Sequence, residues 1–323
     1  MINARTFAIL ISVIALSIVA CRAQTTGEAP VKPVRLAVDD RTDYVNVMGD
    51  AMPELPDFPA LAKKPGKLRG YVKDVLGQPI AGARLGLKSA RIYDAYLAAA
   101  AESDANGYYE INIPTGGARF DYAGFTIKTS RGMAALGLHP ADGALSESYP
   151  AAAGGVENFV MLPYGIADRA GASSQAGYRA NYYGGAFKLI YYISSGSGMG
   201  GTEYMLASGS EIVVALTPLS VLADGNRFAR GFEIRKTIED SSIGELNVVN
   251  LPIGRYRIAV AQANGKPLKM RQKAPTDSVF GMRPAETESG SAEIVFNPLS
   301  DDARTAAPSR GNWTDLEIVV ERP

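Results

Sequence analysis

Apolar and polar residues alternate along short segments of the first half of this chain. In residues 67–74, Leu68, Gly70 and Val72 share one face, and the intervening positions are charged or aromatic. The same period of two residues recurs over 83–88 and over 108–113, where Pro114 ends the run. Residues 91–102 contain four consecutive alanines, whose high helix propensity predicts a short helical insertion.

The second half of the chain shows further short strand patterns separated by turn residues. The dipeptide Asn264-Gly265 between two of them is typical of a tight β-hairpin turn. Short strands at this spacing predict a second sandwich. The predicted strands cover residues 187–193, 211–217, 228–235, 245–251, 256–261, 267–270, 292–296 and 316–320.

These patterns predict an all-β chain with two tandem β-sandwich domains. The segment 145–178 is rich in Gly, Ala and Ser around the apolar run Phe159-Val-Met-Leu-Pro, which reads as the last strand of the first domain. We therefore place the first sandwich at 67–163, a linker at 164–180 and the second sandwich at 181–323.

Residues 21–66 show no sustained periodicity and are interpreted as a proline-containing linker. Prolines recur there at every third position from Pro53 to Pro59, which is the repeat of a polyproline II helix. Leu55, Phe58 and Leu61 have the same spacing, so one edge of the extended segment is apolar. We expect that edge to lie against the first domain.

Residues 1–20 have the pattern of a signal peptide, with a basic start and an apolar run over 7–20. Spanning a bilayer takes about 20 apolar residues, so this run is too short for a comfortable transmembrane helix. Its end, Ile18-Val-Ala-Cys21, resembles the lipobox of bacterial lipoproteins. The resemblance implies that Cys21 is lipidated, that the mature chain begins there, and that the protein is tethered in the cell envelope, on the outer membrane of a Gram-negative bacterium. The alternative is an ordinary cleavage site with an incidental cysteine.

The composition excludes some kinds of cross-link and of binding partner. Cys21 is the only cysteine, which excludes an internal disulfide and a cysteine-based metal site. Lys plus Arg and Asp plus Glu both number 33, so no basic excess draws the chain to nucleic acid.

Two blocks of the first domain resemble the carboxypeptidase regulatory-like domain. They are the run from Gly70 to Leu85, with Gly-Gln-Pro-Ile-Ala-Gly-Ala at its centre, and Asp104-Ala-Asn-Gly-Tyr-Tyr. The resemblance implies a transthyretin-like sandwich that scaffolds or binds without catalysis. A third block departs from the family, because Arg119-Phe120 stands where a tyrosine is usual, and the two-histidine metal motif of the peptidases is absent. Val249 to Ile258 is similar to the family's closing block, which implies that the second domain is of the same kind.

Candidate chemistry is sparse. The chain has one histidine, His139, and no Gly-x-Ser-x-Gly motif accompanies it, so we interpret it as structural rather than as part of a Ser-His-Asp triad. Asp104-Ala-Asn-Gly could begin a calcium loop, but the distal ligands are missing and a turn is favoured. The run from Gly196 to Gly201 lacks the lysine of a phosphate-binding loop. We therefore predict no catalytic residue, no metal site and no cofactor.

Aromatic residues cluster between positions 178 and 192 and are the feature most open to a binding role. Tyrosine pairs an apolar face with a polar tip, which suits stacking on sugar rings or contact with a protein partner. Alternatively the rings fill the interior of the sandwich. The members expected to bind a ligand are Tyr178, Tyr182 and Tyr183.

Together these features predict a non-enzymatic cell-envelope lipoprotein that acts as a binding or scaffolding module. Its expected partners are the membrane, through the lipid anchor, and a glycan or another envelope protein. The alternatives are a carbohydrate-binding accessory protein and a hydrolase with an unrecognised carboxylate site.

Overall fold

The structure is a computed structural model that describes residues 32–323 except 90–96, 145–146, 195–202, 222–228, 274–278 and 309. Residues 32–323 form one compact unit. The predicted signal peptide, Cys21 and the loop from Gly196 to Gly201 lie outside the described residues. No helix of the described part has the length and apolar composition needed to cross a membrane.

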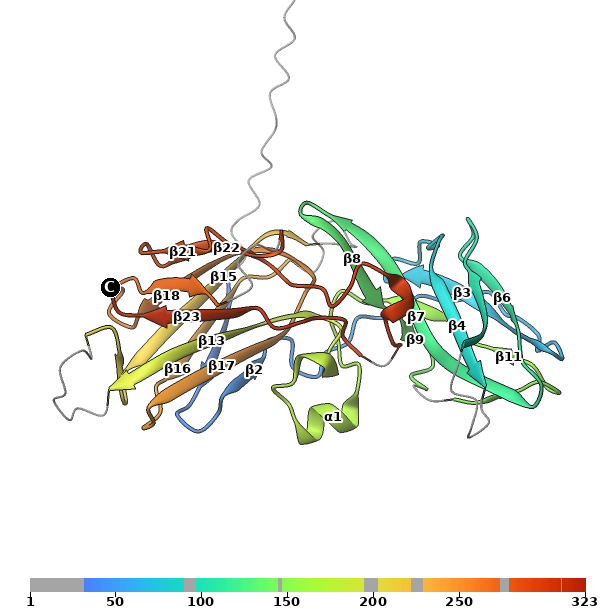
Figure 1. Cartoon of the computed structure of the whole chain (residues 1–323), viewed down its shortest axis with the longest axis horizontal. Coiled ribbons are helices and arrows are strands. Elements are labelled where there is room, and N and C mark those ends of the chain that lie inside the picture. Colours follow the sequence, from blue (N-terminus) through green and yellow to red (C-terminus); the bar gives the residue numbers. More distant parts are fainter. Residues whose placement is uncertain are drawn as a thin grey trace, which may run out of the picture. The chain divides into compact units, whose positions relative to one another are not determined.

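The described chain is almost entirely β and forms two sandwiches, which confirms the predicted fold class (Figure 1). One sheet of the first sandwich has the order β10 (Tyr149–Pro150), β7 (Gly117–Thr129), β4 (Arg84–Ser89), β5 (Leu97–Glu102), with β8 (Gly132–Gly137) beside β7. The other has the order β11 (Gly155–Val156), β3 (Lys67–Asp74), β12 (Phe159–Met161), β9 (His139–Pro140), with β6 (Tyr108–Asn112) beside β3.

The second sandwich is larger and also has two sheets. The first has the order β1 (Val34–Val38), β16 (Phe232–Thr237), β15 (Glu211–Val221), β18 (Gly254–Gln262), β22 (Ser291–Val295), β20 (Gly281–Arg283). The second has the order β2 (Tyr44–Asn46), β17 (Ile243–Leu251), β13 (Gly185–Ser194), β23 (Glu317–Glu321), β19 (Lys269–Gln272), β21 (Glu286–Thr287), with β14 (Leu206–Ala207) beside β13. The described helices are α1 (Arg169–Ser174) and the single 3-10 turns η1 (Arg179–Asn181) and η2 (Ala303–Thr305).

Buried residues alternate with more exposed ones along the strands, and the buried residues form the two cores. In β3, Leu68 and Val72 are buried on one face, as the sequence pattern predicts. In β13 the buried positions again follow a period of two residues, because successive side chains of a strand point to opposite faces of the sheet. The Asn264-Gly265 turn forms with Gly265 in the left-handed region, but its two arms pair only at the Ala261–Pro267 bridge.

The predicted helical insertion is wrong over the described residues 97–102. This alanine-rich segment is strand β5, which pairs with β4 in the register Leu85–Ala101 and Gly86–Ala100. Helix propensity is a weak preference of less than about 1 kcal/mol per residue. Hydrogen bonding to the edge of β4 and packing of Ala99 and Ala101 against the core outweigh it.

The segment 21–66, predicted as a linker, contributes two strands to the second sandwich. β1 pairs in parallel with β16, and β2 pairs in parallel with β17. The first sandwich is therefore inserted between β2 and the rest of the second sandwich. The expected apolar edge is confirmed for Leu55 and Phe58, which pack against a small cluster that contains Val160 and Leu162 of the first sandwich.

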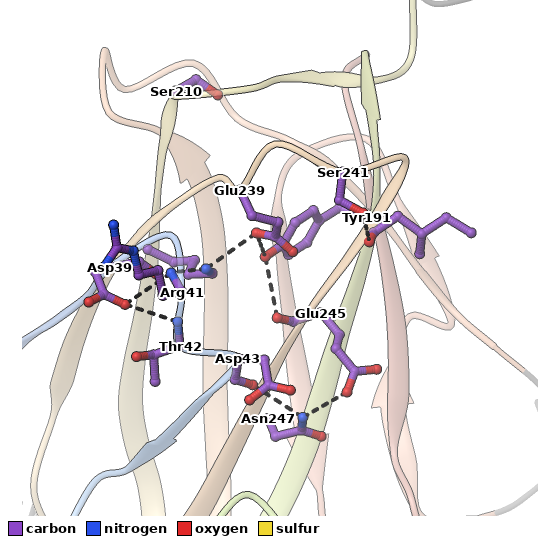
Figure 2. A network of polar contacts seen from close by, with 12 residues as sticks. Asp39, Arg41, Thr42, Asp43, Tyr191, Ser210, Glu239, Ser241, Glu245 and Asn247 are labelled. Carbon is purple, nitrogen blue, oxygen red and sulfur yellow. Dashed lines mark hydrogen bonds and ion pairs between the residues drawn. The ribbon is translucent and has the colours of Figure 1, made fainter. Parts of the chain in front are cut away.

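A buried lysine holds the end of β1 in place, next to a polar network that includes Asp39, Glu239 and Tyr191 (Figure 2). The side chain of Lys236 on β16 is 1% exposed, and its Nζ donates a 2.8 Å hydrogen bond to the carbonyl oxygen of Asp39 just after β1. The same Nζ lies 3.3 Å from Oε2 of Glu239, which also accepts a 3.0 Å hydrogen bond from the hydroxyl of Tyr191 on β13. These contacts join both sheets of the second sandwich to the entering chain.

Residues 300–312 connect the two sandwiches. This segment follows β22 and lies along β7 and β8 before the chain returns as β23 (Figure 1). Ala135 donates its backbone N–H to Ser300 at 2.9 Å, and Asn312 Nδ2 donates to the carbonyl of Ala135 at 2.8 Å. Gly124 on β7 permits the close approach, because a Cβ there would lie 2.2 Å from the carbonyl oxygen of Ala303.

The segment 164–180, also predicted as a linker, packs against both sandwiches. Ala167 belongs to an apolar cluster with Leu162 of the first sandwich, and Ile166 belongs to another with Val249 of the second. α1 begins after Asp168, whose side chain accepts a hydrogen bond from the N–H of Gly171. This segment therefore forms part of the wall between the two sandwiches.

Candidate functional site

The three tyrosines predicted to bind a ligand do not share a surface. Tyr182 and Tyr183 are 2% and 3% exposed, and their hydroxyls donate to the carbonyls of Ala176 at 2.7 Å and Pro308 at 2.5 Å. This corrects the expectation that all three offer ring faces, because a buried ring cannot stack on a sugar. Both satisfy their hydroxyls internally, which is the usual requirement for burying tyrosine.

Tyr178 is the one member of the three that can contact a ligand, since it is 43% exposed. The guanidinium carbon of Arg179 lies 5.5 Å from its ring centroid. Arg179 is itself held by Asp315, with Nη1 and Oδ1 2.7 Å apart, and by a 2.8 Å hydrogen bond from Nε to the carbonyl of Trp313. A shallow cavity of about 130 Å³ adjoins this ring and is lined by Lys188 among others.

His139 is the most constrained polar group in the wall between the sandwiches. It is 8% exposed, and its Nδ1 lies 3.1 Å from the hydroxyl of Tyr183. That hydroxyl donates its proton to the Pro308 carbonyl, which can only accept, so it must accept from Nδ1–H. Nε2 therefore carries the lone pair, and it makes no hydrogen bond with any described residue.

Burial keeps the His139 imidazole neutral. It lowers the pKa of His139 to about 4, an effect that the Asp142 carboxylate opposes and the Arg169 guanidinium reinforces. Among the described residues, no serine hydroxyl is bonded to either ring nitrogen, so His139 does not complete a Ser-His-Asp triad there. The bond to Tyr183 fixes the orientation of the His139 ring.

A cavity lies beside His139 and is called the His139 cavity below. Its volume is about 690 Å³. Three segments line it: the segment around Met52, which was predicted as a linker, the loop after β9, and the residues at the start of α1. Its lining residues are Met52, Leu55, His139, Ala141, Asp142, Gly143, Ile166, Ala167, Asp168, Arg169 and Ala170.

A second cavity, of about 220 Å³, contains a buried carboxyl group. Glu157 is 3% exposed, and its Oε2 accepts a 2.5 Å hydrogen bond from the hydroxyl of Tyr149. Burial, together with the nearby carboxylates of Asp142 and Glu147, raises the pKa of Glu157 to about 7, although the Tyr149 hydrogen bond opposes the rise. Oxygen atoms of Asp142, Glu147 and Glu157 all lie within 4.8 Å of one another.

Sequence reasoning missed this carboxylate group. Its members are separated by stretches without a recognisable motif, and only the return of the chain through β10 and β11 brings them together. The alternative of a hydrolase with an unrecognised carboxylate site would place its chemistry here. Asp142 belongs to the carboxylate group and also lines the His139 cavity, so the loop that contains Asp142 contributes to both.

Comparison with known proteins gives a loose likeness of fold. No family model matches the chain, and no curated protein matches it. The Bacillus anthracis TIE protein is 9% identical with a TM-score of 0.32, over 79% of this chain and 33% of that one. A streptococcal ancillary pilin is 15% identical with a TM-score of 0.23, over 80% and 62%. The shaft pilin spaA of Lactobacillus rhamnosus GG is 10% identical with a TM-score of 0.21, over 80% and 97%.

The TM-scores of these three solved structures are 0.32, 0.23 and 0.21, so the likeness is distant. The chain spans about a third of the first protein and under two thirds of the second. The finer resemblance to the carboxypeptidase regulatory-like domain is not confirmed by any of the comparisons. The functional argument below therefore depends on the chain's own residues.

Proposed function

We propose that this protein is a lipid-anchored, non-enzymatic binding module of the cell envelope, with its ligand in the His139 cavity. The observation that carries the proposal is the cavity itself. Small-molecule sites typically enclose about 300–1,000 Å³ and combine apolar walls with a few convergent polar groups. The His139 cavity has this size and this lining.

The walls of the cavity are fixed by contacts that exist without a ligand. Nδ1 of His139 is bonded to Tyr183, and the N–H of Ile166 donates to Sδ of Met52 at 3.1 Å. Asp168 caps α1 through its bond with the N–H of Gly171. A site assembled in advance loses less conformational entropy on binding, which favours a binding role.

The neutral state of His139 argues against acid–base catalysis by this residue. A general base is most effective when its pKa is near the working pH, whereas the pKa of His139 is lowered to about 4. Its Nδ1 is bonded to a tyrosine rather than to a carboxylate that would stabilise the imidazolium. For the alternative of a carbohydrate-binding protein, Tyr178 is the one of the three tyrosines whose ring is exposed enough to stack on a sugar.

Anchoring at Cys21 is tested by labelling with a fatty acid in a Gram-negative host. We expect the wild-type protein to carry the label and to fractionate with membranes, because two or more acyl chains hold a protein on a bilayer. The Cys21→Ser variant is expected to lose both properties. Label that persists in this variant would show that the anchor is elsewhere.

Occupancy of the cavity is tested with N-phenyl-1-naphthylamine, a neutral apolar dye whose fluorescence rises in apolar surroundings. We expect residues 22–323 to bind it, and Ala141→Trp to weaken binding at least about tenfold because the indole fills space beside His139. Ala60→Trp, at an exposed position in the same half of the chain, is the matched control. Equal dye affinity in both folded variants would remove the cavity from the proposal.

A further inference from the structure

We propose that the His139 cavity selects ligands that carry an ammonium group on an apolar body. The inference rests on the proposed function, because it names the ligand class of the same site. Three features of the lining point to it: an unpartnered acceptor, an excess of fixed carboxylates, and an apolar wall.

The first feature is the lone pair of His139 Nε2. His139 is more than nine-tenths buried and lines the cavity, and Nε2 has no hydrogen-bond partner among the described residues. A ligand that donates a hydrogen bond to Nε2 gives this acceptor a partner within the cavity and gains affinity from it. An ammonium group offers three N–H donors and no acceptor, whereas a carboxylate offers only acceptors.

The second feature is the charge of the lining. Asp142 and Asp168 each have one oxygen fixed by a backbone N–H, from Ala144 at 2.8 Å and from Gly171 at 2.9 Å. Neither carboxylate has an ion-pair partner among the described residues. Arg169 is the only cation among the lining residues and is exposed, as Asp142 is, so two carboxylates stand against one guanidinium. The fixed groups therefore make the cavity favour a positive charge.

The third feature is the apolar wall, which excludes small inorganic cations as the preferred occupant. Met52, Leu55 and Ile166 line the cavity together with the alanines. Burying apolar ligand surface against them contributes about 25 cal/mol per Å². A ligand with both an ammonium group and a hydrocarbon body contacts the polar groups and the apolar wall at the same time.

The experiment compares three ligands with the same phenyl body: phenethylamine, 2-phenylethanol and phenylacetate. Isothermal titration calorimetry on residues 22–323 at pH 7.4 measures each dissociation constant. We expect the amine to bind at least about tenfold more tightly than the acid, with the alcohol between them. An acid that binds as tightly as the amine would overturn the inference.

Two variants, each of which removes one charge from the lining, test which residues cause the preference for the amine. Asp142→Asn keeps the acceptor for the Ala144 N–H, and we expect it to weaken amine binding about fivefold while leaving the alcohol unchanged. Arg169→Gln is expected to strengthen amine binding, and Asp40→Asn, an exposed position outside the cavity, is the control. Equal losses for all three ligands in Asp142→Asn would contradict the charge argument.

The outcomes separate this inference from the proposed function. If the naphthylamine dye binds and Ala141→Trp displaces it, but the amine shows no advantage over the acid, the ligand class is wrong and the cavity remains a binding site. If neither the dye nor any phenyl ligand binds, both proposals fail.

Discussion

A Glu157→Gln variant is expected to be about 3 kcal/mol more stable than the wild type at pH 8, and about equally stable at pH 4. Glu157 is buried, and its pKa rises from 4.5 to about 7 in the folded state. Each unit of pKa shift corresponds to about 1.4 kcal/mol. The folded state therefore holds the Glu157 proton more tightly than the unfolded state does.

The sign of the effect follows from this difference in proton affinity. The stabilisation is fully present below pH 4.5 and is lost as the pH rises through about 7, because the buried carboxyl must then ionise. Glutamine stays neutral and can still accept the hydrogen bond from the Tyr149 hydroxyl. It therefore removes the cost of ionisation without removing that bond.

The measurement is urea unfolding of the wild type and the variant at pH 4, 6 and 8, compared as a difference. His139 makes the comparison necessary, because its lowered pKa gives stability that is present above pH 6.5 and lost as the pH falls towards 4. The two groups oppose each other in the total curve, but only Glu157 enters the difference. Glu54→Gln, at an exposed position, is the control. A difference that stays constant across this pH range would contradict the argument.

Replacing Lys236 with methionine is expected to lower the free energy of unfolding by about 3 kcal/mol. The substitution leaves Glu239 without its cation and the carbonyl of Asp39 without its donor (Figure 2). Removing one partner of a buried ion pair typically costs about 3–5 kcal/mol. We take the lower end because the side chain of Glu239 is 20% exposed and keeps its hydrogen bond from Tyr191.

The neighbouring residue Arg235 provides a matched control. It lies on the same strand, its side chain is 46% exposed, and it pairs with Glu211 at 2.7 Å and with Glu233 at 3.2 Å. Exposed pairs contribute about 0–1 kcal/mol, so Arg235→Met should cost far less than Lys236→Met. Equal losses in urea unfolding would show that burial of Lys236 does not matter.

A double variant tests the cause of the loss. Glu239→Gln keeps an acceptor for the Tyr191 hydroxyl but carries no charge. Lys236→Met combined with Glu239→Gln is therefore expected to recover part of the stability lost in Lys236→Met alone. Faster amide hydrogen exchange in β1 is expected in the single variant, because Lys236 holds the residue that follows this strand.

The sequence by itself determined most strands of the two sandwiches. In β3 and β13 one face is buried. Because successive side chains of a strand point to opposite faces, buried and less buried residues alternate along the sequence. It did not predict β1, β2, β5, β7 or β8. β5 is a strand because β4 lies beside it, and β1 and β2 are short parallel strands whose partners lie about 200 residues later in the chain.

Only the tertiary structure decided the candidate site. The sequence showed that His139 is the single histidine and that tyrosines cluster near position 180, but it could not show which rings are buried. Tyr182 and Tyr183 lie in an irregular segment between sheets, where no period assigns a face and carbonyls of distant residues accept their hydroxyls. Likewise Asp142 and Glu157 meet because strands return past each other, and such long-range approach leaves no local pattern in the sequence.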